Sequence, residues 1–165
     1  MLYDSGKYEL AAPEDLTPKK RLEKAKEYFE YWMNKADNFY DIHKFCLEKG
    51  LYSNAAFELH QATENYYAAF SLVFTDYKPK THELADLRKR AINIHEALKA
   101  IFPLNTQEEQ DRFDLLCRAY VDARYNKDYS ITVEELKYLA EKVALLRKLV
   151  EQLCEEEIAR LQKQL

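Results

Sequence analysis

Apolar residues in the segment 53–75 follow two neighbouring helical stripes. The first recurs at alternating steps of four and three residues and consists of Ala55, Leu59, Ala62, Tyr66, Ala69 and Val73. The second lies beside it and consists of Ala56, His60, Thr63, Tyr67, Phe70 and Phe74. A helix needs two such stripes only when other elements cover it on two sides. The pattern therefore predicts that this helix lies in the middle of a bundle.

Four further helices are predicted from the same kind of periodicity, and capping residues mark several of their ends. Thr-Pro at 17–18 is typical of a helix start, and Gly50 is typical of a helix end. Two capping boxes of the form Thr-x-x-Glu begin at Thr106 and Thr132. The expected helices are 17–50, 53–75, 81–101 with Thr81 as its cap, 106–125 and 132–155.

The expected fold class is therefore all-α, a five-helix up-and-down bundle with a four-helix-bundle core. Residues 1–16 lack the helical period, and their Asp-Ser-Gly sequence suggests a short extended arm or hairpin. Residues 17–155 should form the bundle as one domain. The highly charged residues 156–165 are expected to fray as a tail.

Composition narrows the class of protein. The 165 residues, 47% hydrophobic and 33% charged, are enough for one globular helical domain. No apolar run is long enough to cross a bilayer and no signal-peptide pattern is present, so a cytoplasmic protein without membrane contact is expected. The four histidines are scattered and no H-E-x-x-H occurs, so no metal site is expected. A net charge of −4 argues against general coating of nucleic acid but permits a local basic cleft.

Polar residues interrupt the apolar helix 53–75 within two turns, at His60, Gln61, Glu64 and Asn65. A buried polar group without a partner costs about 1–3 kcal/mol, so these side chains must pair, reach water or meet a ligand. His60 and Glu64 are four residues apart and face the same way. They form either a satisfied core pair or part of the lining of a ligand cleft.

The loop after this helix carries Lys78, Lys80 and His82. His82 either meets an anion at the start of the next helix, where backbone N–H groups favour negative charge, or docks the loop.

Arg124 is the strongest candidate for ligand binding. Its guanidinium can grip a phosphate with two N–H groups, and Tyr120, one turn earlier, can stack on it. The alternative is an ion pair with Asp122 or Asp128. Tyr125, next in the chain, can stack on a base.

Three segments, in this order along the chain, resemble the HEPN domain family. They are Leu-His-Gln-Ala-Thr-Glu at 59–64, Tyr-Lys-Pro-Lys-Thr-His at 77–82 and Ala-Tyr-Val-Asp-Ala-Arg-Tyr at 119–125. The resemblance covers residues 20–155. It implies a helical bundle that dimerises through the helices 53–75 and 106–125 around a shared cleft. Some members carry a nucleotidyltransferase domain ahead of the bundle, and the arm 1–16 resembles the tail of such a domain.

The resemblance also raises the question of ribonuclease activity. In ribonuclease members of the family, an Arg is followed a few residues later by a His. Here the Arg is Arg124, but Tyr129 stands where the His would be. A phenol is about three pKa units less acidic than an imidazole, so Tyr129 would be a poor base at neutral pH. The Tyr that accepts a nucleotidyl group in some toxin members corresponds to Ile131.

The leading expectation is a dimeric HEPN module without ribonuclease activity. It would bind a nucleotide (ATP, GTP or AMP) or an RNA phosphate, require no cofactor, and partner a nucleotidyltransferase domain or protein. One alternative is a metal-independent ribonuclease toxin that uses Arg124 with Tyr129 or His60. A second alternative is a non-catalytic dimerisation scaffold. The expected ligand-binding residues are Arg124, Tyr125, Tyr120, His60, Glu64, Lys78, Lys80 and His82.

Overall fold

The structure is a computed structural model that describes residues 17–165, and every regular element within that range is a helix. The α-helices are α1 (Pro18–Glu48), α2 (Tyr52–Thr75), α3 (Leu84–Ile94), α4 (Gln107–Arg118), α5 (Asp122–Tyr125) and α6 (Val133–Lys163), with a 3₁₀ helix η1 (Glu96–Ala100) after α3. The predicted all-α class is confirmed. The predicted arm at 1–16 lies outside the described residues.

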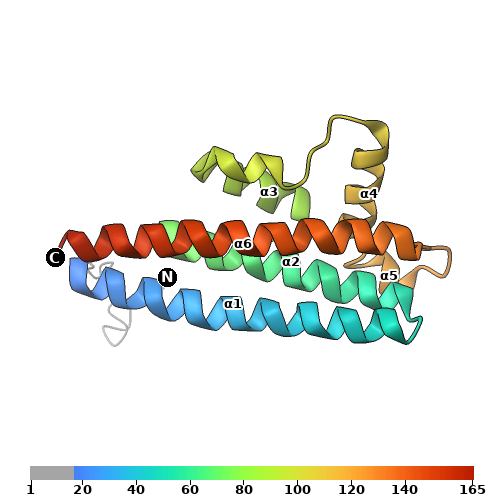
Figure 1. The fold of residues 1–165 in the computed structure, drawn as a ribbon, viewed down its shortest axis with the longest axis horizontal. Coiled ribbons are helices and arrows are strands. Elements are labelled where there is room, and N and C mark those ends of the chain that lie inside the picture. The colour runs from blue at the N-terminus through green and yellow to red at the C-terminus, as the bar shows by residue number, and fades with distance from the viewer. Residues whose placement is uncertain (1–16) are drawn as a thin grey trace, which may run out of the picture.

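Helix α2 occupies the middle of the molecule, as its two apolar stripes predict. The long helices α1, α2 and α6 run side by side, and α3 and α4 cover the remaining side (Figure 1). Helix α2 contacts all four of these helices as well as α5. Its buried positions run almost without interruption from Ala55 to Val73 and include both stripes except for Phe74, which is partly buried. The short connection between α1 and α2 makes these two helices an antiparallel hairpin.

Capping explains where the long helices begin and end. The Thr17 side chain accepts a hydrogen bond from the Lys20 backbone N–H at 3.2 Å. Gly50, just after α1, has a φ of 74°, a conformation that glycine adopts without the steric cost of a Cβ. Both predicted capping boxes are present, at Thr106 before α4 and at Thr132 before α6. The three threonine caps therefore set the first residues of α1, α4 and α6.

One polar cluster ties the three long helices together. Arg147 of α6 donates two hydrogen bonds to the Asp37 carboxylate of α1, at 2.7 and 3.1 Å. Tyr66 of α2 donates to the same carboxylate at 2.5 Å. Burial alone would raise the pKa of Asp37, but the bonds from Arg147 and Tyr66 outweigh burial and lower it. The cluster therefore holds the ionised form of the carboxylate.

The predicted third and fourth helices each end earlier than expected. Helix α3 begins at Leu84 rather than at Thr81, and it ends at Ile94 instead of near Ile101. His95 is extended there, with φ −149° and ψ 113°, and its ring accepts the Ala97 backbone N–H at 3.4 Å. This local bond competes with helix continuation.

The predicted helix 106–125 is divided in two. Helix α4 ends at Arg118, a turn follows, and the single-turn helix α5 starts at Asp122. The turn matters for function because it presents Tyr120 and Arg124 on neighbouring turns.

The prediction of a frayed tail at 156–165 is wrong. Helix α6 continues to Lys163, with Leu161 buried and Glu157 only 9% exposed. Arg160 donates to the Glu157 carboxylate at 2.7 and 2.8 Å. High charge misled the prediction, because the apolar stripe that holds α6 against the bundle persists through this segment. None of the helices within residues 17–165 is long and apolar enough to cross a membrane.

Candidate functional site

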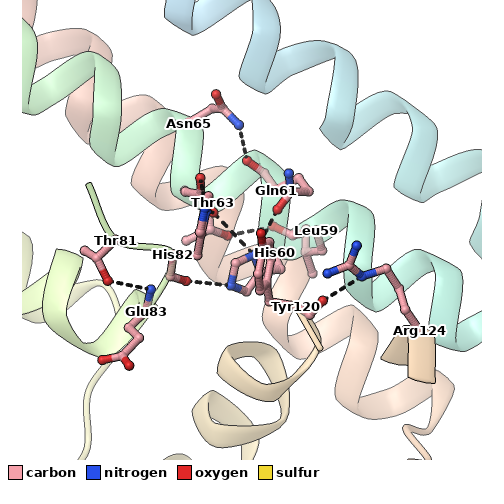
Figure 2. Close-up of polar contacts among 11 residues, drawn as sticks. Leu59, His60, Gln61, Thr63, Asn65, Thr81, His82, Glu83, Tyr120 and Arg124 are labelled. Atoms are coloured by element: carbon pink, nitrogen blue, oxygen red, sulfur yellow. Dashed lines mark hydrogen bonds and ion pairs between the residues drawn. The ribbon is translucent and has the colours of Figure 1, made fainter. Parts of the chain in front are cut away.

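Three segments distant in sequence meet at the candidate site: the middle of α2, the loop 76–83, and the turn that joins α4 to α5 (Figure 2). The loop is tied to α2 at its start, where the Ser71 and Thr75 hydroxyls donate to the Tyr77 carbonyl at 2.6 and 3.3 Å. It is tied again at its end, where the His82 carbonyl accepts from the His60 ring at 3.2 Å. These hydrogen bonds therefore fix both ends of the loop against α2.

The His60 side chain is completely buried, so its hydrogen-bond partners lie within the protein. Its Nε2 faces the His82 carbonyl, and its Nδ1 lies 3.3 Å from Oε1 of Gln61. Burial is the main reason that the pKa of His60 is lowered to about 4, and the nearby charge of Arg124 contributes in the same direction. His60 is therefore a neutral docking residue at neutral pH.

Glu64 pairs with His82 rather than mainly with His60. The His82 Nδ1 lies 3.1 and 3.0 Å from the two oxygens of the Glu64 carboxylate, whereas the His60 Nδ1 lies 3.9 Å from it. The Glu64 side chain is 10% exposed, and that of His82 is 55% exposed. A largely buried carboxylate thus fixes an imidazole that reaches solvent.

The Tyr120 ring lies at the centre of the site and contacts three other rings. The His82 ring stacks on it, with centroids 4.5 Å apart and planes inclined by 10°. The His60 ring lies 5.3 Å away, and Phe57 stacks at 6.3 Å. Such contacts add about 0.5–1.5 kcal/mol each beyond burial, so Tyr120 is held in one orientation.

Arg124 lies at the other end of the same tyrosine. Its Nε donates to the Tyr120 backbone carbonyl at 2.7 Å (Figure 2). The guanidinium carbon lies 4.6 Å from the ring centroid of Phe57, 4.8 Å from that of Tyr120 and 5.0 Å from that of Tyr125. Three aromatic rings therefore surround the cation.

The alternative of an ion pair at Arg124 is not formed anywhere in residues 17–165. The Asp122 carboxylate accepts instead from Arg118, at 2.9 Å. Asp128 donates its backbone N–H to the side-chain oxygen of Asn126, at 2.9 Å. Because Nε is already bonded to a carbonyl, the two terminal nitrogens of the Arg124 guanidinium are left for a ligand. A phosphate is the anion whose geometry best fits such a pair of donors.

A cavity of about 540 Å³ opens beside Tyr120. It is lined by Lys80, Thr81, His82, Glu83, Cys117, Arg118, Tyr120, Val121 and Asp122. The Cys117 thiol is not a nucleophile here, since burial raises its pKa to about 12. Lys80 and Arg118 place two cations on the cavity wall, and Glu83 and Asp122 place two carboxylates there. The Arg118 guanidinium is paired with Asp114 and Asp122.

Two of the expected site residues point elsewhere, and a third lies at the rim. Lys78 lies over the Trp32 ring of α1, 5.3 Å from its centroid. Tyr129 is only 6% exposed, donates to the Leu115 carbonyl at 2.7 Å, and lies against Arg118 rather than Arg124. Burial raises the pKa of Tyr129. Tyr125 is 76% exposed and can meet a base only from outside.

The sequence reasoning missed Phe57, whose ring contacts both Tyr120 and Arg124. Its place one turn before His60, on the same face of α2, was the signal available. It also missed Asp122 as a cavity residue, although its place four residues after Arg118 on the predicted helix was a signal for their pairing.

Comparison with known proteins agrees with this geometry. The family model for the HEPN domain matches residues 29–153, which include the whole candidate site. The chain belongs to the HEPN domain family. Membership indicates an RNA-related or nucleotide-binding helical module, and HEPN domains commonly dimerise. No curated protein matches the chain. Within residues 17–165, no group of three or more His, Cys, Asp and Glu side chains is arranged to hold a metal ion.

Proposed function

We propose that this protein is a HEPN module that binds the phosphate of a nucleotide or of an RNA strand at Arg124. The observation that carries this proposal is the state of the Arg124 guanidinium: one nitrogen is fixed by the Tyr120 carbonyl, three aromatic rings surround it, and no carboxylate of residues 17–165 neutralises it. The Tyr125 ring supplies a face on which a base can stack.

Titration of the protein with ATP, GTP, AMP and a short single-stranded oligoribonucleotide tests this proposal. A ligand at 100 times its dissociation constant is expected to stabilise the fold by about 2.7 kcal/mol, which a thermal shift detects. Inorganic phosphate alone should shift the melting temperature less, since it cannot stack. Absence of any shift with all four ligands at millimolar concentration would remove the binding proposal and favour a dimerisation scaffold.

The ribonuclease alternative that relies on Tyr129 or His60 receives no support from the site. RNA cleavage without a metal needs a group that exchanges a proton near neutral pH at the surface of the site. Tyr129 donates into the core, and His60 is buried with its Nε2–H donated to the His82 carbonyl. Catalysis by either residue, and a toxin role that depends on it, is therefore not part of the proposal.

The proposed homodimer would form near the N-terminal end of α2 and α5. The doubly apolar face of α2 is satisfied within one molecule, so it cannot also be the interface. Apolar side chains remain exposed at the start of α2 and beside α5: Leu51, Tyr52 and Val121. A dimer through them would bring two Arg124 side chains toward one shared groove.

Light scattering tests the dimer directly. The wild-type protein is expected to have twice the mass of one chain at micromolar concentration. Tyr52→Asp combined with Val121→Asp should give a single chain, because each change places a charge in an apolar contact. Leu145→Asp is the matched control, since Leu145 is a 50% exposed apolar residue on α6. A wild-type protein of single-chain mass would rule the dimer out.

A nucleotidyltransferase domain or protein is the proposed partner, and it is supported only by the family resemblance. A nucleotidyltransferase reading frame fused to this one or adjacent to it, followed by co-purification of the two products, is the expected result. Separate elution of the two proteins at micromolar concentration would count against the partnership.

A further inference from the structure

A second cavity, of about 550 Å³, opens where α3 is followed by η1 and by the connection to α4 (Figure 1). Its walls consist of Arg88, Glu96, Ala97, Lys99, Ala100, Pro103, Leu104 and Asn105. None of these residues lines the cavity beside Tyr120, so the two are separate. Sites for small molecules commonly measure roughly 300–1,000 Å³. The second cavity is therefore large enough for a small metabolite.

Arg88 is the wall residue with the most unused hydrogen-bonding capacity. Its half-buried guanidinium donates from Nη2 to the Phe102 carbonyl at 2.9 Å and lies 6.0 Å from the centroid of the Phe113 ring. Its Nε is buried without a partner among residues 17–165, and its Nη1 makes no hydrogen bond to any of them. A guanidinium has five N–H donors, so the bond to one carbonyl leaves most of them for a ligand.

Arg88 also lacks a counter-charge. Five other arginines of the described range are paired with carboxylates: Arg90, Arg112, Arg118, Arg147 and Arg160. No carboxylate within residues 17–165 is paired with Arg88. A cation withdrawn from water without a counter-charge costs free energy, and an anion in the cavity would offset that cost.

The two weak acids close to Arg88 do not supply the missing negative charge. They are the Tyr67 phenol, which is 2% exposed, and the Cys117 thiol. Burial raises the pKa of each group, and the positive charge of Arg88 offsets only part of that rise. Both groups therefore stay neutral at neutral pH, and the charge of Arg88 remains available to an anion from outside.

Lys99 places a second cation on the same wall. It is exposed on η1 and forms no ion pair in the described part of the chain, not even with Glu96 three residues earlier. A phosphate monoester carries a charge of about −1.5 to −2 at pH 7, which matches two cations better than the single charge of a carboxylate does.

The remaining wall residues suit the rest of such a molecule. The Glu96 carboxylate and the Asn105 amide can accept hydrogen bonds from hydroxyl groups. Apolar side chains provide contacts for carbon atoms: Ala97, Ala100, Pro103 and Leu104.

We propose that this cavity binds the phosphate monoester of a small hydroxylated molecule, with the phosphate held by Arg88 and Lys99. The site is independent of the function proposed for Arg124, because it shares no residue with that site and needs no base to stack. A ligand there would connect α3 to η1 and to the segment that leads into α4.

Isothermal titration with ribose 5-phosphate and glycerol 3-phosphate tests the proposal, since neither molecule carries a base that could stack on Tyr125. Both are expected to bind to the wild-type protein and to Arg124→Ala with equal affinity, whereas ribose and glycerate should bind more weakly. Lys99→Glu should lower the affinity for both phosphates by at least about tenfold. Lys89→Glu is the matched control, because Lys89 is an exposed lysine of α3 that does not line the cavity, and it should leave the affinity unchanged.

Arg88→Gln should weaken binding as strongly as Lys99→Glu. Because it also removes the bond to the Phe102 carbonyl, Lys99→Glu is the decisive variant if Arg88→Gln does not fold. Lys99 makes no side-chain hydrogen bond within residues 17–165, so its replacement should leave the fold intact. In NMR spectra of the wild-type protein, either phosphate should shift the backbone amide signals of Ala97, Lys99 and Asn105.

Each contrary result overturns a defined part of the proposal. Absence of binding by both phosphates at millimolar concentration would overturn the site as a whole. Binding that is lost in Arg124→Ala but kept in Lys99→Glu would move the phosphate to Arg124, which would overturn this inference and support the proposed function. Glycerate that binds as tightly as glycerol 3-phosphate would overturn the assignment of a phosphate.

Discussion

Replacement of Arg124 by alanine is expected to weaken binding of nucleotide or oligoribonucleotide by about 10- to 100-fold. A hydrogen bond between a guanidinium and a phosphate contributes roughly 1.5–3 kcal/mol, and each 1.4 kcal/mol is a factor of ten in affinity. Arg124 is exposed and makes one hydrogen bond, to the Tyr120 carbonyl, so its loss should leave the fold intact. Isothermal titration with the ligand that binds best measures the change.

Two control variants sharpen the result. Arg90→Ala removes an exposed arginine of α3 that is paired with Asp86 at 2.9 Å, and it should leave affinity unchanged. Arg124→Lys keeps the charge but loses the pair of terminal donors, and it should fall between wild type and Arg124→Ala. Equal affinities for wild type and Arg124→Ala would place the binding site elsewhere.

Buried His60 should make the fold sensitive to mild acid. The pKa of His60 is lowered to about 4 in the folded protein by burial, whereas an exposed histidine titrates near 6.5. Between pH 6.5 and pH 4, His60 therefore binds a proton in the unfolded chain but stays neutral in the folded protein. The stability contributed by neutral His60 is complete above pH 6.5 and is lost as the pH falls toward 4. The expected loss between pH 7 and pH 5 is about 2 kcal/mol.

Urea denaturation of wild type and of His60→Gln across this range measures the effect. His60→Gln lowers stability at pH 7, because a packed ring is removed, but its free energy of unfolding should fall less steeply with acid. His43, which is also buried and has a lowered pKa, adds a similar slope to both proteins and cancels in the difference. Parallel curves for the two proteins would show that His60 is not held neutral by the fold.

Much of the fold follows from local rules that the sequence displays. The caps at Thr17, Thr106 and Thr132 are contacts between residues three apart, so their sequence spacing is sufficient to predict them. The central place of α2 follows from its two apolar stripes. The early end of α3 does not, because it depends on the extended backbone of His95, a residue that any helical pattern would accept.

The site was predictable in composition but not in pairing. The residues His60, Glu64, His82, Tyr120 and Arg124 were all expected near a ligand, and the structure brings them together. Spacing of four residues suggested that His60 would pair with Glu64. The observed partner of Glu64 is His82, 18 residues further along the chain, because the loop folds back over α2.

Tyr129 shows the opposite case. Its sequence position suggested a place in the site, yet it packs under α4, since the turn after α4 sends the following segment away from Arg124. Tyr129 takes this position because the predicted helix ends at Arg118. The sequence near Arg118 contains no proline or glycine from which that end could be predicted.

The most direct measurement of the central claim is a crystal structure of the protein bound to a short single-stranded oligoribonucleotide. The account predicts a phosphate within hydrogen-bonding distance of the two terminal nitrogens of Arg124, with a base against Tyr125. A strand bound on another face, with the Arg124 guanidinium still in contact only with Tyr120 and its neighbouring rings, would contradict it.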